Sequence, residues 1–404
     1  MCFTSPTALV DTPVGGGQAN FMDEQDRTHL KILVAEDHFN MRRTICNMLK
    51  KMGYRQIVDA EDGKVAWDRM QTEHFDLVIA DWIMPRMEGI DLLRRARGTD
   101  QFRSLPFLIV TGVVDEETVA EAAETEVDAY IIKPFVAKTL EERMDQILDR
   151  HFNPDEVEIL VKLGNEHLRA GRYELALQEF ERARSACPRS PRILCLLGEV
   201  CEKQGRLRQA EEQYLEAIQV GPLFVRAYQR MADLYEQQGL REKAAQLLEQ
   251  ATKISPRNTE RQIRLGRLYL DTGESEKACD AFSEAMRVAA QSDEIRAQIG
   301  EVFLGHDMAE EAAHAFEGAL RINPHNVHVY NRLGIAYRKQ GKLKEAVEQY
   351  RRALKVAPND ENIYYNLGRA LLEAAMREDA LRAFQYALKI NPDFSEVREI
   401  LATL

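Results

Sequence analysis

Residues 77–85 read LVIADWIMP, an apolar run that ends at a carboxylate. The run from Leu77 to Ala80 has no helical period, so we expect a strand that is buried on both faces, with Asp81 at its carboxyl end. In open α/β sheets, ligands bind at that edge because loops surround it. Asp81 is therefore a candidate functional residue.

Three further apolar runs end in polar residues that could act together with Asp81. The runs are residues 31–35, 107–110 and 129–132, and the polar residues that follow them are Glu36 and Asp37, Thr111, and Lys133. Short strands that alternate with helical segments indicate a parallel sheet, and the carboxyl ends of its strands converge on one crevice. The crevice would hold three acids, a hydroxyl group and an amine.

This set of side chains has a chemical logic. Three neighbouring carboxylates repel one another and raise one another's pKa unless a cation neutralises them. Mg²⁺ fits, because a few carboxylates, a backbone carbonyl, waters and a phosphate oxygen complete its octahedral shell. One carboxylate could then attack a phosphoryl donor, as in aspartyl-phosphate chemistry. Lys133 would neutralise phosphate charge and Thr111 would donate a hydrogen bond to it.

These residues resemble the receiver domain of two-component response regulators in identity, order and spacing. Asp81 lies 44 residues after Asp37, and Thr111 and Lys133 lie 30 and 52 residues after Asp81. The resemblance covers roughly residues 29–150. It implies a flavodoxin-like α/β fold, in which a five-stranded parallel sheet carries helices on both faces.

The resemblance also implies the role of each residue. The metal ligands for Mg²⁺ would be Glu36, Asp37, Asp81 and the backbone carbonyl of Ile83. The phosphoryl chemistry would use Asp81 as the acceptor, Lys133 and Thr111, and the switch residues would be Thr111 and Tyr130. A histidine kinase is the implied phosphodonor. The chain is not expected to be an enzyme beyond catalysing its own phosphoryl uptake and autodephosphorylation. The alternative is a receiver fold that has lost phosphorylation.

The composition suggests two or three domains in 404 residues. The formal charge of −12 disfavours non-specific attraction to nucleic acid or to an anionic membrane. The six cysteines form no Cys-x-x-Cys pair, and no run reaches the roughly 18 apolar residues of a membrane span. We therefore expect a soluble, reduced, cytoplasmic protein. Residues 1–28 lack periodicity, contain three consecutive glycines and predict a flexible tail.

Beyond the predicted receiver domain, residues 29–152, the pattern changes to helical segments with a 34-residue period. Alanine recurs every 34 residues from Ala176 to Ala380, and glycine recurs from Gly164 to Gly368 with Ala232 in one place. A large residue recurs as Phe180, Tyr214, Leu248, Phe282, Phe316, Tyr350 and Phe384. Small residues let paired helices approach closely, and the large residue fills the space beside them.

This pattern resembles the tetratricopeptide repeat, whose period is 34 residues. Seven repeats would occupy residues 157–394, and residues 395–404 would form a capping helix. The resemblance implies an all-α superhelix with a concave face for a protein or peptide. The candidate groove residues are Asn331, Arg338, Asn362, Tyr365 and Arg369. The same stripe is acidic in its middle, with Glu199, Glu202, Asp233, Glu236, Glu294 and Glu301. A solvated surface explains these charges as well as a ligand does.

Together these patterns predict a response regulator that is phosphorylated on Asp81 and acts by phosphorylation-gated protein binding through its repeats. The alternative is a phosphorelay intermediate or phosphate sink whose repeats dock a kinase. A transcription factor is disfavoured, because no basic helix-turn-helix is left over. The acidic segment at residues 116–121 is expected to dock on the repeats or on a second protomer in a homodimer.

Overall fold

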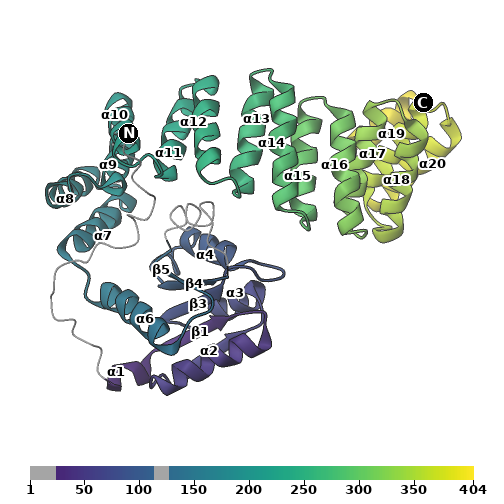
Figure 1. Cartoon of the computed structure of the whole chain (residues 1–404). Helices are drawn as coiled ribbons and strands as arrows, with labels where there is room; N and C mark the ends of the chain where they lie inside the picture. Colours follow the sequence, from purple (N-terminus) through teal and green to yellow (C-terminus); the bar gives the residue numbers. More distant parts are fainter. Residues whose placement is uncertain (1–23, 113–126) are drawn as a thin grey trace, which may run out of the picture. The chain divides into compact units, whose positions relative to one another are not determined.

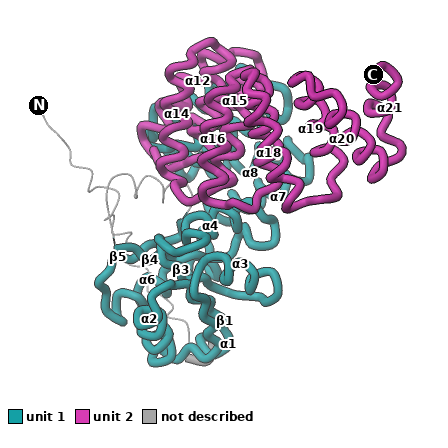
Figure 2. The backbone as a smooth tube through the Cα atoms, turned by 90° about the vertical axis from the view of Figure 1, so that its right-hand side faces the viewer, with its two compact units in different colours: residues 1–227 teal, residues 228–404 magenta. Residues whose placement is uncertain are grey.

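The computed structural model describes residues 24–112 and 127–404 (Figure 1). The chain divides into two compact units, Met1–Ala227 and Tyr228–Leu404 (Figure 2). The division falls within helix α11, Val225–Gln237. The first unit contains the sheet and the first two helix pairs that follow it. The acidic segment at residues 116–121 lies outside the described residues.

Five parallel strands form one sheet in the order β2-β1-β3-β4-β5. The strands are β1 (Lys31–Ala35), β2 (Gln56–Ala60), β3 (Leu77–Asp81), β4 (Phe107–Thr111) and β5 (Ala129–Ile132). The predicted α/β class, with its five-stranded parallel sheet, is confirmed. Strand β2 was not located in advance, because its sequence QIVDA has only two apolar residues between polar ones and lies at the sheet edge.

Helices cover both faces of the sheet, which explains why its central strands are continuously apolar. Leu33, Val78 and Ala80 face a core that is shared with α3 and α4. Ile32 and Ile79 face a second core, shared with α2 and α6. These helices are α2 (Phe39–Lys51), α3 (Gly63–Thr72), α4 (Gly89–Gly98) and α6 (Ala137–Phe152).

The prediction of a flexible tail over residues 1–28 is wrong for its last residues. Helix α1 spans Glu24–His29, and Arg27 pairs with Glu141 at 2.5 Å and with Asp145 at 3.0 Å, both on α6. The arginine also lies 5.9 Å from the centre of the Tyr54 ring. The sequence pattern missed this helix because a six-residue helix has no readable period, and distant side chains hold it in place.

After α6 the chain forms seven consecutive helix pairs and one further helix. The first helices of the pairs are α7 (Glu156–Arg169), α9 (Pro191–Lys203), α11 (Val225–Gln237), α13 (Thr259–Asp271), α15 (Asp293–Gly305), α17 (Val327–Lys339) and α19 (Glu361–Glu373). The second helices are α8 (Tyr173–Ala186), α10 (Leu207–Val220), α12 (Arg241–Ile254), α14 (Ser275–Val288), α16 (Ala309–Ile322), α18 (Leu343–Val356) and α20 (Arg377–Ile390). The last helix is α21 (Ser395–Thr403). Among the described residues, no helix has the length and apolar character that crossing a membrane requires.

The periodic glycines lie where an aromatic ring leaves no space for a side chain. A Cβ added to Gly300 would lie 2.6 Å from the Phe316 ring, and the glycines at 164, 198, 266, 334 and 368 face rings in the same way. The third repeat has Ala232 instead of glycine, and Leu248 stands where the others have a ring. The small residue and the large one are therefore matched within each pair.

Side-chain caps define where most of the first helices begin. The capping residues are Asp155, Ser190, Asn258, Ser292, Asn326 and Asp360. Each accepts a hydrogen bond from a backbone N–H in the first turn, which would otherwise lack an intrahelical partner. These caps mark the start of six of the seven repeats.

Candidate functional site

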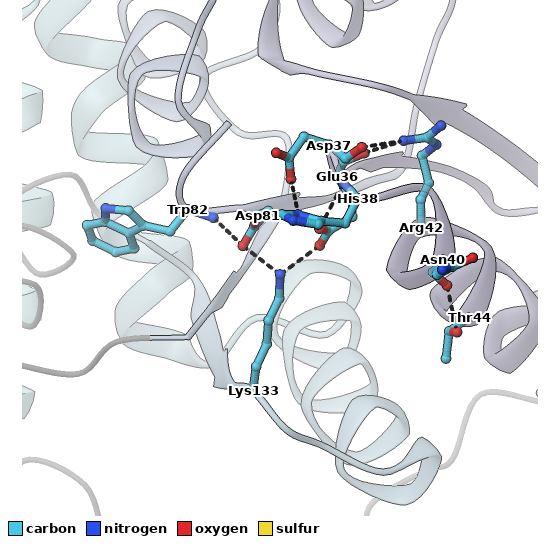
Figure 3. Close-up of polar contacts among 9 residues, drawn as sticks. All are labelled: Glu36, Asp37, His38, Asn40, Arg42, Thr44, Asp81, Trp82 and Lys133. Carbon is cyan, nitrogen blue, oxygen red and sulfur yellow. Dashed lines mark hydrogen bonds and ion pairs between the residues drawn. The ribbon is translucent and has the colours of Figure 1, made fainter. Parts of the chain in front are cut away.

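Four of the predicted site residues meet at the carboxyl edge of the sheet (Figure 3). Strands β1 and β3 are neighbours, with Ala35 opposite Ala80, so the loop after β1 lies beside Asp81. Lys133 Nζ lies 2.8 Å from Glu36 Oε2 and 3.0 Å from Asp81 Oδ1. Asp37 follows Glu36 in the same loop. The strand ends therefore bring these four side chains together, as the sequence predicts.

The site has more negative charge than its one ammonium group neutralises. The side chains of Glu36 and Asp81 are only 1% and 10% exposed. Burial raises the pKa of both carboxyl groups, although the hydrogen bond from Lys133 acts in the opposite direction. Burial lowers the pKa of the Lys133 amine, but its hydrogen bonds to both carboxylates outweigh this effect and raise it overall. The carboxyl groups are costly to ionise in this buried site, and the carboxylates stabilise the charge of Lys133. Another cation would therefore be favourable here.

The other predicted residues lie around this cluster. Thr111 ends β4 and is buried, and its carbonyl accepts a hydrogen bond from the Lys133 N–H at 2.7 Å. Tyr130 on β5 is half-buried and packs against the core that includes Trp82. Ile83 lies two residues after Asp81, with its side chain exposed to solvent. The switch roles of Thr111 and Tyr130 and the carbonyl ligand at Ile83 stay predictions.

The acidic side chains fit a hard divalent cation. Glu36, Asp37 and His38 each offer a ligand atom, and these atoms lie within 4.8 Å of one another. Carboxylate oxygens are the ligands that Mg²⁺ prefers. The Asp81 carboxylate, at the end of the adjacent strand, contacts the same lysine as Glu36. His38 was not predicted. Its Nδ1 lies 2.7 Å from Asp37 Oδ1, and its side chain is 79% exposed.

Close backbone approaches around Asp81 were also missed by the sequence analysis. A Cβ on Gly89 would overlap the Asp81 carbonyl oxygen, so glycine lets α4 begin against the end of β3. Arg86 has φ 65° and contacts the buried carboxylate of Asp62, which caps α3 by accepting a hydrogen bond from Val65 N at 2.8 Å. The sequence shows the dipeptide Glu88-Gly89, but it does not show that Arg86 and Asp62, which lie in different loops, form an ion pair.

The predicted acidic middle of the repeat groove is largely neutralised, which corrects the sequence-based reading. An arginine of the following repeat pairs with most of these acids. The pairs are Glu199 with Arg226 at 3.0 Å, Asp233 with Arg264 at 2.5 Å, Glu236 with Arg264 at 2.7 Å, and Glu301 with Arg332. Sequence position did not reveal these partners because they are 25 or more residues away.

The candidate groove residues near the C-terminus form local contacts. Asn331 accepts a hydrogen bond from Asn366 at 2.9 Å, and Arg338 pairs with Glu373 at 2.7 Å. Arg369 donates to the Tyr365 hydroxyl at 3.0 Å, with its guanidinium 5.8 Å from the centre of that ring. Asn362 is exposed. Within the described parts of the chain, Arg369 forms no ion pair, whereas Arg338 is neutralised.

Family models match both parts of the chain. Residues 32–145 match the response regulator receiver domain, and residues 157–200 match the tetratricopeptide repeat. Residues 190–400 match the family of tetratricopeptide type that is described as the cilia and flagella-associated protein 70 C-terminal domain.

Individual proteins resemble the same two parts. The chemotaxis protein CheY-3 of Vibrio cholerae serotype O1 is 40% identical over 122 residues, which is 30% of this chain and 94% of that protein. The chemotaxis protein CheY of Pseudomonas aeruginosa is 39% identical over 121 residues, 30% of this chain and 98% of that protein. A solved tetratricopeptide repeat protein from Parabacteroides merdae is 20% identical with a TM-score of 0.38, covering 61% of this chain and 98% of its own. The chain belongs to the response regulator receiver family, and its receiver domain is followed by tetratricopeptide repeats.

Proposed function

We propose that this protein is a phosphorylation-controlled adaptor: a histidine kinase phosphorylates Asp81, and the repeats bind a partner protein according to that state. The observation that carries the proposal is the contact of Lys133 with both Glu36 and Asp81 at the sheet edge. The chemistry is limited to phosphoryl uptake and autodephosphorylation of this chain itself. The five described cysteines form no disulfide, as is usual for proteins of a reducing cytoplasm.

The geometry suggests which atom of Asp81 reacts. Lys133 Nζ and the Trp82 N–H both contact Oδ1, each at 3.0 Å. No donor contacts Oδ2 among the described residues, so Oδ2 is the nucleophile. It forms a bond to phosphorus while the bond from phosphorus to the leaving group breaks, and the leaving group departs with its electron pair.

Two side chains and a bound cation would support this step. Mg²⁺, held by Glu36, Asp37 and Asp81, would supply charge stabilisation at the phosphoryl oxygens. The Lys133 ammonium lies close enough to exchange a carboxylate partner for a phosphoryl oxygen, and the Thr111 hydroxyl would donate a hydrogen bond to another.

Magnesium should stabilise the receiver domain. We expect millimolar Mg²⁺ to raise its melting temperature by several degrees, because saturation at 100 times Kd contributes about 2.7 kcal/mol. Both tryptophans, Trp67 and Trp82, lie in this domain, so fluorescence follows its unfolding in the full chain. Asp37→Asn should remove the shift. Asp100→Asn, at an exposed acid that follows α4 and pairs with Arg103 at 3.2 Å, should keep it. A full magnesium response in Asp37→Asn would refute the ligand assignment.

Phosphorylation should change what the repeats bind. The acyl phosphate carries about −1.5 to −2 charges where the Asp81 carboxylate carried one negative charge, so the site becomes more negative and bulkier. Complete switching would need about 5.5 kcal/mol of differential binding, so we expect a partial shift. Full-length protein with and without acetyl phosphate would be used to capture partners, with Asp81→Asn as the unresponsive control. Partner amounts that ignore phosphorylation would contradict gating.

The second candidate, a phosphorelay intermediate or phosphate sink, predicts a different outcome. The repeats would then retain a kinase regardless of phosphorylation, and Arg369→Ala would reduce phosphoryl uptake from that kinase but not from acetyl phosphate. Arg382→Ala is the control, because this arginine of α20 is 66% exposed and pairs with Glu378 and Asp379 of its own helix. If the repeats bind a protein other than a kinase, and bind different amounts of it with and without phosphorylation, the adaptor is favoured.

A further inference from the structure

Arg42 reaches from the first turn of α2 back to the loop that carries the acidic pair (Figure 3). Its Nη1 donates to the backbone carbonyl of Glu36 at 2.6 Å and to that of Asp37 at 3.3 Å. Its Nε donates to Asp59 Oδ2, on β2, at 3.1 Å. The arginine side chain is only 12% exposed, so these contacts hold it in a single orientation.

Arg42 contributes more to the orientation of Asp37 than to that of Glu36, because Glu36 has other contacts that hold it. Glu36 is also held by its N–H, which donates to the Ala60 carbonyl at 3.1 Å, and by the contact of its carboxylate with Lys133. The Asp37 side chain contacts the exposed imidazole of His38. Its direction therefore follows the backbone conformation, which the guanidinium stabilises through two successive carbonyls.

We propose that Arg42 is a positioning residue for the cation site. By binding both carbonyls, it fixes the directions in which the side chains of Glu36 and Asp37 leave the backbone. This inference rests on the proposed function, which makes those two side chains cation ligands. Groups that orient metal ligands from outside the coordination shell typically change metal affinity by about 10–100-fold when they are removed.

The sign of the effect separates positioning from charge. Arg42 is a cation near a cation site, so on charge alone its removal would strengthen Mg²⁺ binding. Loss of position would weaken binding instead. Weaker Mg²⁺ binding in Arg42→Ala would therefore indicate a loss of position, because loss of the positive charge alone would make binding stronger.

Arg97 is a matched control for the loss of a structural arginine. Its Nη1 donates to the backbone carbonyls of Arg103 at 2.9 Å and Leu105 at 2.8 Å, and its Nη2 pairs with Asp128 at 2.7 Å. Leu105 lies just before β4, at the amino edge of the sheet. Arg97→Ala thus removes the same kind of contacts at the edge opposite the site.

The test is a Mg²⁺ titration of the full chain, followed by tryptophan fluorescence and by calorimetry. We expect the Kd to rise about 10–100-fold in Arg42→Ala and to stay unchanged in Arg97→Ala. Arg42→Lys keeps the charge but not the planar fork, so its Kd should lie between wild type and Arg42→Ala. Circular dichroism would show whether Arg42→Ala is folded. If it is not, Arg42→Lys becomes the test, and its Kd for Mg²⁺ should be several-fold above that of the wild type.

The outcomes separate this inference from the proposed function. An unchanged or lower Kd in Arg42→Ala, or an equal rise in Arg97→Ala, would overturn the role of Arg42 while leaving the cation site intact. A wild-type chain that binds no Mg²⁺ at millimolar concentration would overturn the proposed function itself.

Discussion

Asp81→Asn should take up no phosphoryl group from acetyl phosphate and magnesium, whereas the wild-type chain should take up one. The amide is not a nucleophile for this reaction, and Asp81 is the acid that ends the central strand and contacts Lys133. Intact-protein mass spectrometry measures the uptake. Hydroxylamine should release the group from wild type, as expected of an acyl phosphate.

The control for this experiment is another aspartate of the same domain. Asp91 is exposed in the first turn of α4 and pairs with Arg94 at 2.5 Å, so Asp91→Asn should be labelled normally. Lys133→Ala should be labelled slowly, because the charge that faces the phosphoryl oxygens is lost. Equal labelling of Asp81→Asn and wild type would place the acceptor at another residue.

Phe316→Ala should destabilise the repeats by about 3–5 kcal/mol, the usual cost of removing a buried aromatic ring. The Phe316 side chain is fully buried against Gly300 of the partner helix. Because a repeat contacts only its neighbours, the loss should be concentrated in α15 and α16. Hydrogen exchange measured along the chain would detect it there. Leu381→Ala, at a position that is 39% exposed, should change stability by no more than about 0.5 kcal/mol.

The third repeat supplies a test of the same packing within this chain. Gly300→Ala should cost about 1–3 kcal/mol, because the new methyl group would lie 2.6 Å from the Phe316 ring. The double variant Gly300→Ala with Phe316→Leu reproduces the natural pair Ala232 and Leu248, so the leucine should relieve part of that cost. A double variant whose loss equals the sum of the two single losses would contradict the matching of small and large residues.

Local sequence patterns were sufficient for most of the architecture. The apolar run that ends at Asp81 predicted a central strand, and the structure has it as β3 with neighbours on both sides. The 34-residue recurrence of small and large residues predicted the helix pairs. Strand β2 and helix α1 were missed, because an edge strand with polar ends and a six-residue helix carry little periodic signal.

The amino-acid sequence by itself determined the order of the strands' polar ends, the period of the repeats and the residue types in the crevice. Hydrophobic periodicity and turn residues act over a few positions, so they can be read along the chain. Only the tertiary structure decided which charges meet: Lys133 between Glu36 and Asp81, Arg42 on the acidic loop, and Arg264 against Asp233. Ion pairs and hydrogen bonds form over a few ångströms between residues that can be distant in sequence, and only folding brings them within that range.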